Sequence, residues 1–291
     1  MRNPTETLNI PFLLAELEFN CLTHHVYLTG SLVDGYANAG SDIDLFVIGE
    51  QSNNRSSAQY SKTQQRWLDV RYLTEGDILS LKQQVEVNEK LPRHWGEHNI
   101  ANLDRLETYH RLANATPLTT QSHSTAIHRL VDRSRLKFEA AITHLIIARA
   151  RWEDAAGSLV SEDIQQCAFV AEIGLWHALD SIAALQGLTN PSSKWRLKKM
   201  AQMHMDAPWF NNAKDYFLHD RPSGFSSLKP LLLLGPLIYQ VTHYLYAGNF
   251  DNTLPDCQPG ERVEVDSQGL VFIGAGTRAR RPENTAERPN H

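Results

Sequence analysis

Residues 24–50, HHVYLTGSLVDGYANAGSDIDLFVIGE, decide the fold. A short apolar segment, Val26–Leu28, runs into the pair Gly30-Ser31, and a second apolar segment follows after a polar connection, at Ile43–Ile48. This order predicts two strands joined through a tight Gly-Ser turn. The backbone N–H groups and the hydroxyl of such a turn form a plausible cradle for a phosphate group.

The second strand opens with two acids that flank one apolar residue, Asp42-Ile43-Asp44. Because alternate side chains of a strand point to the same face, Asp42 and Asp44 are predicted to project together while Ile43 enters the core. Two neighbouring carboxylates repel each other, which raises a pKa. A divalent cation removes that cost, and hard oxygen ligands suit Mg²⁺. The stretch therefore predicts a site for a metal ion and a triphosphate.

This arrangement of Gly-Ser, spacer and Asp-x-Asp resembles the nucleotidyltransferase superfamily related to DNA polymerase β. Members of that superfamily take a third carboxylate from a later strand, and Asp69 in RWLDVRYL, residues 66–73, is the matching acid. Period-two alternation places Trp67, Asp69 and Arg71 on one face of that strand. The alternative, a solvated turn with chance acids at a strand edge, must explain all three features together.

The resemblance covers residues 23–73 and implies the cofactors and the site. Two Mg²⁺ ions would be held by Asp42, Asp44 and Asp69, which would also be the catalytic residues. A nucleoside triphosphate, ATP or another, would be the co-substrate, with Gly30 and Ser31 among the nucleotide-binding residues.

Composition places the chain among ordinary globular proteins. It has 291 residues, of which 42% are hydrophobic and 21% charged, and a net charge of −5. This charge argues against a dedicated nucleic-acid binder, although a local basic groove stays open. The three cysteines are far apart in the sequence, and the N-terminus lacks a basic start followed by an apolar run. Both features favour a reducing, cytoplasmic compartment.

The most apolar stretch, Leu231–Ala247, is too short for a membrane span and contains Gly235, Pro236 and Gln240. A span needs about 20 largely apolar residues. The stretch is therefore predicted to be a buried core helix, and no membrane partner is expected.

The expected fold class is α+β, with a small mixed β-sheet nucleotidyltransferase domain followed by an all-α helical domain. The predicted divisions are residues 1–92, 93–250 and 251–291, the last a hairpin over 261–273 with a disordered tail. Helices are expected over 6–22, 76–88, 123–156, 161–187, 194–205 and 225–247. The Ser-, Asn- and Gln-rich segment 51–65 is predicted to be a surface loop near the site.

This layout is similar to that of small-molecule nucleotidyltransferases such as aminoglycoside and lincosamide adenylyltransferases. In these enzymes a lysine of the helical domain commonly reaches the phosphates, and Lys194 is the candidate here; the alternative is an exposed basic patch. The general base is left open between Asp69 and a helical-domain acid, Glu172, for which a structural pairing is the favoured alternative.

The expected activity is transfer of a nucleoside monophosphate, AMP from ATP, to a hydroxyl of a small-molecule acceptor. One alternative is a macromolecular acceptor, an RNA end or a protein side chain as in antitoxin-like enzymes; another is a non-catalytic nucleotide-binding module. Two other patterns carry little weight. His94–His98 matches a zinc-protease motif without a firm helix around it, and the spacing of Arg105 and His110 fits RNA-cleaving partners poorly.

Overall fold

A computed structural model describes residues 8–17, 24–50, 56–88, 99–119, 127, 130–203, 205, 207–220 and 227–247, and the strand backbones 263–265 and 271–273. The described chain forms two compact units. The first comprises residues 1–146 and 179–204, and the second comprises residues 147–178 and 205–291. The predicted division at residue 92 and the zinc-protease pattern at 94–98 lie outside the described residues.

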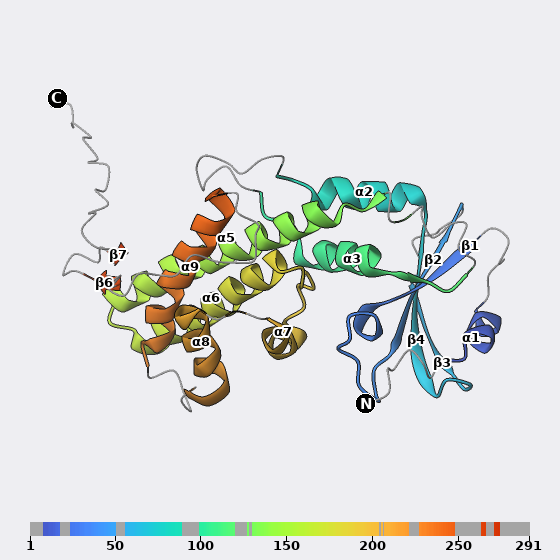
Figure 1. Ribbon diagram of the computed structural model, residues 1–291, viewed down its shortest axis with the longest axis horizontal. Helices are drawn as coiled ribbons and strands as arrows, with labels where there is room; N and C mark the ends of the chain where they lie inside the picture. Colours follow the sequence, from blue (N-terminus) through green and yellow to red (C-terminus); the bar gives the residue numbers. More distant parts are fainter. Residues whose placement is uncertain are drawn as a thin grey trace, which may run out of the picture. The chain divides into compact units, whose positions relative to one another are not determined.

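The first unit is built on a five-stranded mixed sheet in the order β3-β4-β2-β1-β5 (Figure 1). Its strands are β1 (His24–Thr29), β2 (Ile43–Gly49), β3 (Ser56–Ser61), β4 (Arg66–Leu73) and β5 (Thr116–Pro117). Strands β2 and β4 are parallel, and the other neighbouring pairs are antiparallel. With the helical C-terminal region, this sheet confirms the predicted α+β class.

Alternation along the central strands separates a core face from a second face, called the polar face here because it carries Asp44 and Asp69, although Phe46 and Ile48 on it are also buried. Ile43, Leu45, Leu68 and Val70 are at most 1% exposed and pack in one cluster with Leu13. Leu13 comes from α1 (Ile10–Glu16), so this short helix covers the core face. The intervening residues of β2 and β4 are left on the opposite face of the sheet.

The predicted loop over 51–65 is wrong for residues 56–61, which form the edge strand β3. An edge strand needs only one hydrogen-bonded neighbour and tolerates polar residues on both faces. The composition of this segment therefore resembled that of a loop. Strand β5 was also not expected within the helical region; Pro117 fits there because β5 is an edge strand and its missing N–H is not needed.

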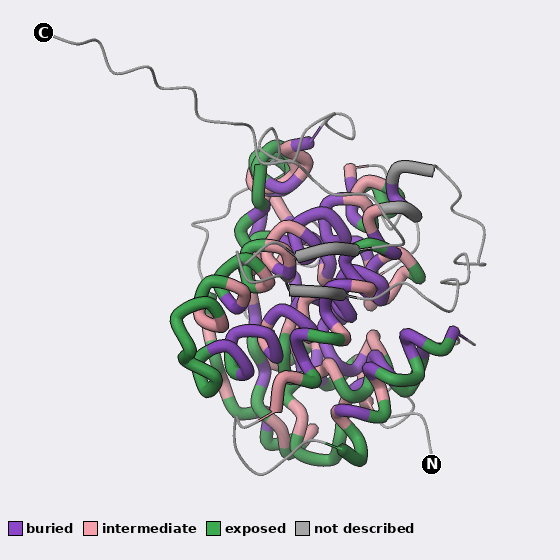
Figure 2. Tube along the Cα trace, turned by 90° about the vertical axis from the view of Figure 1, so that its left-hand side faces the viewer, coloured by how far each residue is buried: buried purple, intermediate pink, exposed green. Residues whose placement is uncertain are grey.

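The six expected helices are present in order with shifted ends, whereas the helices at Leu103–Asn114 and Pro208–Asp215 were not among them. Buried and exposed residues alternate along the helices (Figure 2). Both units share the long helices α5 (Arg133–Val160) and α6 (Ile164–Leu185). The first unit also contains α2 (Glu75–Val85), α3 (Leu103–Asn114), α7 (Arg196–Gln202) and the 3₁₀ turns η2 (Gly30–Leu32) and η5 (Ser193–Trp195). The second contains α8 (Pro208–Asp215), the π-helical turn η6 (Tyr216–Asp220), α9 (Lys229–Ala247), β6 (Val263–Val265) and β7 (Val271–Ile273).

The second unit confirms two expectations about the C-terminal half. The apolar stretch at 231–247 lies within α9, and its Leu231, Leu234 and Leu237 are at most 3% exposed. Strands β6 and β7 pair antiparallel, as expected of a hairpin. Among the described residues, α6 alone has the length and hydropathy of a membrane span, and 72% of its apolar window is buried inside the protein. A buried core helix passes the same test, so this is weak support for a span.

We expect Leu68→Ala to lower the free energy of unfolding by about 3 kcal/mol, because Leu68 is fully buried under α1 and its loss leaves a cavity. Urea denaturation measures this. Leu197→Ala is the matched control, since Leu197 is 56% exposed and the same truncation should change stability by less than about 0.5 kcal/mol. Equal losses for the two variants would contradict the assignment of the core face.

Candidate active site

The sheet register brings two of the predicted site acids side by side. Asp44 of β2 pairs with Thr29 on one side and with Asp69 of parallel β4 on the other. Asp42 directly precedes β2 and is exposed, as is Asp69. The carboxylate of Asp44 is only 15% exposed. The three acids therefore gather at one end of the polar sheet face, around a partly buried member.

Burial raises the pKa of Asp44 above its usual value. The negative charges of Asp69 and Asp42 raise this pKa further, while the cations Arg111 and Lys194 lower it. The closest cation is Arg111, whose Nη1 lies 3.0 Å from Oδ1 of Asp44. The ionised form of Asp44 is thus stabilised by the positive charge around it, and a further cation would stabilise it more.

Gly30 follows β1 and adopts a left-handed conformation with φ of +69°. A Cβ at this position would lie 2.1 Å from Oδ2 of Asp44, far inside van der Waals contact. Glycine is required here for two separate reasons, the backbone angle and the approach of the carboxylate. The neighbouring Ser31 is buried, and its carbonyl accepts hydrogen bonds from the N–H groups of Tyr36 and Ala37, each at 2.9 Å.

The polar face opens into a cavity of about 540 Å³ beside Asp44 and Asp69. Helix α3, which begins after the capping residue Asn102, provides much of its wall. Arg111 bridges Asp44 and Glu107, its Nη2 lying 2.8 Å from Oε1 of Glu107, and Arg71 of β4 donates to the Thr108 hydroxyl at 3.0 Å. The cavity is lined by Thr29, Asp44, Leu45, Phe46, Ser56, Asp69, Arg71, Asp104, Glu107, Thr108 and Arg111.

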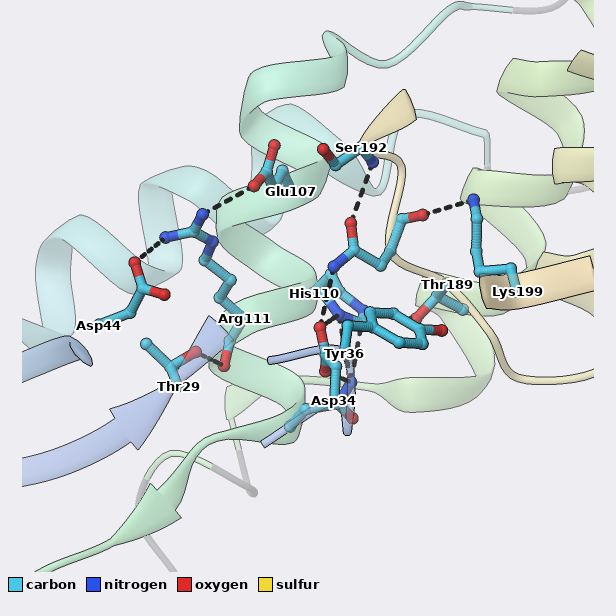
Figure 3. A network of polar contacts seen from close by, with 12 residues as sticks. Thr29, Asp34, Tyr36, Asp44, Glu107, His110, Arg111, Thr189, Ser192 and Lys199 are labelled. Carbon is cyan, nitrogen blue, oxygen red and sulfur yellow. Dashed lines mark hydrogen bonds and ion pairs between the residues drawn. The ribbon is translucent and has the colours of Figure 1, made fainter. Parts of the chain in front are cut away.

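A buried hydrogen-bond network links the Gly-Ser turn to the segment that carries Lys194 (Figure 3). Oδ2 of Asp34 lies 3.0 Å from Nε2 of His110 on α3, and Nδ1 of His110 lies 2.8 Å from the Thr189 hydroxyl. The Asn190 side-chain amide donates to the same oxygen of Asp34 at 2.8 Å. We call Asp34, His110, Thr189 and Asn190 the turn clamp.

Opposing effects set the charge of Asp34. Burial alone would raise its pKa, but the hydrogen bond and positive charge from His110, with the amides of Asn190 and Asn114, outweigh burial and hold the pKa below its usual value. Asp34 is therefore ionised in the fold over the ordinary pH range. The clamp thus holds a carboxylate charge that is only 6% exposed.

The segment that carries Lys194 is also held in place after Lys194, through Arg196 and Lys199. Lys199 is 2% exposed and donates to Asp180 and, at 2.8 Å, to the Asn190 carbonyl. Arg196 Nε also lies 2.8 Å from Asp180. These contacts hold η5 and α7 against the C-terminal turns of α6 and leave Lys194 exposed on η5.

Lys194 is brought close enough to Asp44 for its charge to lower the pKa of that acid. Its ammonium lies 5.0 Å from the centre of the Trp195 ring, and Lys198 lies at the same distance. Trp195 packs on Tyr36 with a centroid distance of 5.5 Å. The basic segment and the Gly-Ser turn therefore share an aromatic contact besides the clamp.

Other candidates have structural partners. Glu172 belongs to the second unit, is 7% exposed and accepts a hydrogen bond from the Tyr216 hydroxyl at 3.0 Å, which gives this acid a structural partner. His110 is 2% exposed within the clamp, which leaves the Arg105–His110 spacing without a catalytic geometry.

The sequence did not predict a role for Asp34, Glu107 or Arg111, and it did not predict that His110 contacts Asp34 and Thr189. A local signal existed for the pair on α3, because Glu107 and Arg111 are four residues apart and share a helix face. No local signal connected Asp34 with residues 110 and 189. Their meeting depends on how α3 and the 187–195 segment pack in three dimensions.

The carboxylates at this site fit a hard divalent cation. Asp42, Asp44 and Asp69 offer only oxygen donors, and the raised pKa of Asp44 shows the energetic cost that a bound cation would relieve.

Comparison with known proteins agrees with this geometry. Residues 13–111 match the family model described as "Nucleotidyltransferase domain". The match begins within α1, includes the sheet acids and continues along α3 to Arg111, and it supports nucleotidyl transfer in general. No curated protein matches the chain. Among solved structures, a nucleotidyltransferase-like protein from Exiguobacterium sibiricum 255-15 covers 78% of this chain and 72% of its own, with 11% identity and a TM-score of 0.44. A likeness of that degree carries no information on activity.

Gly30→Ala is predicted to be far more harmful than Gly35→Ala. Both glycines have positive φ, +69° and +74°, so alanine costs about 1 kcal/mol of backbone strain at either position. Only at Gly30 does the new methyl group meet the Asp44 carboxylate, whereas nothing lies within 4 Å at Gly35. We expect a further loss of about 1–3 kcal/mol for Gly30→Ala in urea denaturation. Equal losses at the two positions would show that Asp44 does not pack against Gly30.

Asp34→Asn should lower the free energy of unfolding by about 2 kcal/mol at pH 7, because it removes charge-assisted hydrogen bonds. Since the folded-state pKa of Asp34 is depressed, its contribution is complete above the unfolded-state value of about 3.9 and is lost as the pH falls through the lower folded-state value. The gap between wild type and variant should therefore persist from pH 7 to 5 and shrink below about pH 4. A gap that instead closes between pH 7 and 5 would contradict this assignment.

Proposed function

We propose that the protein is a metal-dependent nucleotidyltransferase that moves a nucleoside monophosphate, AMP from ATP, to a hydroxyl group of a small-molecule acceptor. The observation that carries the proposal is the pairing of Asp44 with Asp69 across parallel strands, with Gly30 packed against the Asp44 carboxylate. The family match over residues 13–111 supports the general class of reaction.

Each acid and cation has a role in this proposal. Asp42, Asp44 and Asp69 would hold two Mg²⁺ ions, which when bound supply positive charge to the reacting phosphate and activate the attacking oxygen. Gly30, Ser31 and Lys194 would lie along the triphosphate, since the Gly-Ser turn and the lysine segment flank Asp44. The turn clamp would keep these two elements in register.

The reaction is an in-line displacement at the α-phosphorus. The acceptor oxygen forms a bond to this phosphorus, and the bond from the α-phosphorus to the bridging oxygen breaks, so that pyrophosphate leaves with the electron pair. The acceptor proton goes to the Asp69 carboxylate, which is exposed and can pass it to solvent. The protein contributes mainly positioning and charge neutralisation.

Charge around the cavity favours a small acceptor over a nucleic acid. The wall of α3 adds Asp104 and Glu107 to the three sheet acids, and the cavity cations Arg111 and Arg71 are already engaged with Asp44 and Thr108. A phosphate backbone that extends beyond the metal-bound triphosphate would meet the carboxylates of Asp104 and Glu107, which would repel it.

We expect ATP with Mg²⁺ to raise the melting temperature of the protein by about 5 °C at 100 times the dissociation constant, where ligand binding adds about 2.7 kcal/mol. Asp44→Asn should abolish the shift, because the variant removes the central carboxylate of the site. Melting temperatures with each nucleoside triphosphate, with and without Mg²⁺, test the donor and the metal requirement together.

Glu153→Gln is the control for this experiment, because Glu153 is a highly exposed helix acid whose ion pair with Arg149 lies on the surface. It should keep the full shift. A wild-type protein that gains no stability from any triphosphate with Mg²⁺, or an Asp44→Asn variant that keeps the gain, would overturn the proposed function.

A further inference from the structure

Two aromatic side chains extend the polar sheet face beyond the acids. Trp67 precedes Asp69 by two residues on β4 and pairs across the strands with Tyr60 of β3. Gln59, one residue from Tyr60, pairs with Leu68 on the core face and donates to the carbonyl of Glu16 on α1. Because alternate residues face opposite ways, Tyr60 and Trp67 lie on the same face as Asp69.

The register orders this face into rows. Asp44, Asp69 and Ala58 form one row across β2, β4 and β3. The next row toward the start of β4 contains Trp67 and Tyr60, level with Asp42 just ahead of β2. Residues two apart on a strand are separated by about 7 Å. A single six-membered ring that packs on the aromatic row can therefore reach Asp69 with one of its substituents.

Both rings are about half exposed to solvent. Trp67 is 54% exposed and Tyr60 is 52% exposed, and their centroids are 5.7 Å apart in an edge-to-face arrangement. A cross-strand aromatic pair stabilises a hairpin by itself. That role alone does not require both rings to stay half exposed beside three carboxylates. The two rings, set edge to face, form an apolar surface next to the site acids, and we call this pair, Tyr60 and Trp67, the aromatic shelf.

The charges around the aromatic shelf limit what it can bind. On β4 and just ahead of β2 its charged neighbours on the same face are Asp69 and Asp42, and the exposed Lys62 follows Tyr60 by two residues in the turn after β3. Arg66 alternates onto the opposite face, and Arg71 is two rows away and donates to Thr108. Stacked nucleic-acid bases would bring phosphates toward carboxylates without a described cation on this row to compensate them.

We propose that Tyr60 and Trp67 form the acceptor subsite: they pack against the apolar face of a hydroxyl-bearing ring without negative charge, such as a sugar or cyclitol, and present one of its hydroxyls to Asp69. This inference rests on the proposed function and deepens it. Neither residue touches the triphosphate side of the site, because Gly30 and Thr29 lie on the opposite side of Asp44 from β4. The donor and the acceptor are thereby separated across the row of acids.

The experiment uses the full chain with Mg²⁺ and a non-hydrolysable ATP analogue, and follows the indole N–H signals by two-dimensional ¹⁵N NMR. Loss of one signal in Trp67→Phe assigns Trp67. The ring probes are methyl β-glucopyranoside and myo-inositol; sorbitol, which has the hydroxyls but no ring face, is the open-chain control. We expect a saturable shift of the Trp67 signal with at least one ring probe and none with sorbitol.

Variants separate the aromatic shelf from general stability. Trp67→Ala and Tyr60→Ala should weaken ring-probe binding at least about tenfold, a loss of about 1.4 kcal/mol, as followed by probe saturation transfer. Trp67→Phe, which keeps an aromatic ring, should retain most of the affinity for the ring probes. Phe12→Ala is the matched control: Phe12 is 57% exposed on α1, which covers the other sheet face, and its loss should leave probe binding unchanged.

The outcomes distinguish this inference from the proposed function. The acceptor subsite would be overturned if the Trp67 signal did not move with either ring probe or moved equally with sorbitol. It would also be overturned if a single-stranded RNA trinucleotide bound at Trp67 more tightly than the ring probes. The thermal shift with ATP and Mg²⁺ is read separately and should persist in Trp67→Ala. Loss of that shift in the wild-type protein would overturn the proposed function whatever Trp67 does.

Discussion

The rest of the site depends on one constraint, the placement of the partly buried Asp44 carboxylate beside two other acids. Burial and the charges of Asp69 and Asp42 all raise its pKa, so positive charge must be held nearby if the group is to stay ionised. Arg111 supplies the closest charge, at 3.0 Å, and Lys194 adds to it. The absence of a side chain at Gly30 lets the strand end approach the same carboxylate. Sheet register, turn geometry and helix position all converge on one group.

Helix α3 links both halves of the site because of its periodicity. Glu107 and Arg111, four residues apart, face Asp44, whereas His110 and Asn114, also four apart, face Asp34. The two pairs are offset by three residues, so a single helix holds the Gly-Ser turn from one face and the strand acid from the neighbouring face. Since Thr189 also contacts His110, the position of the lysine-bearing segment depends on the same helix.

Local patterns were sufficient to predict the parts of the site that are close in sequence. Alternation in residues 42–44 and 66–73 gave the correct face for Asp44 and Asp69, and the α+β class followed from the contrast between strand and helix periods. The roles of these acids stay predictions. Asp34, Arg111 and the turn clamp could not be predicted because the residues that contact one another are 67 to 156 positions apart in the sequence. Strand β3 was missed because a polar edge strand and a loop have the same composition.

The ion pair between Arg111 and Asp44 also bears on how a cation would enter. Arg111 is shared between Asp44 and Glu107, at 3.0 and 2.8 Å, so its release from Asp44 would not leave a buried charge without a partner. A divalent cation at Asp44 would compete only for the first of these contacts. The guanidinium would then stay anchored by Glu107 at the wall of the cavity, with donors free to face an anion. Arg111 keeps its ion pair with Glu107 when a metal ion replaces the guanidinium at Asp44. This replacement therefore costs less free energy than it would for an arginine that is paired with Asp44 alone.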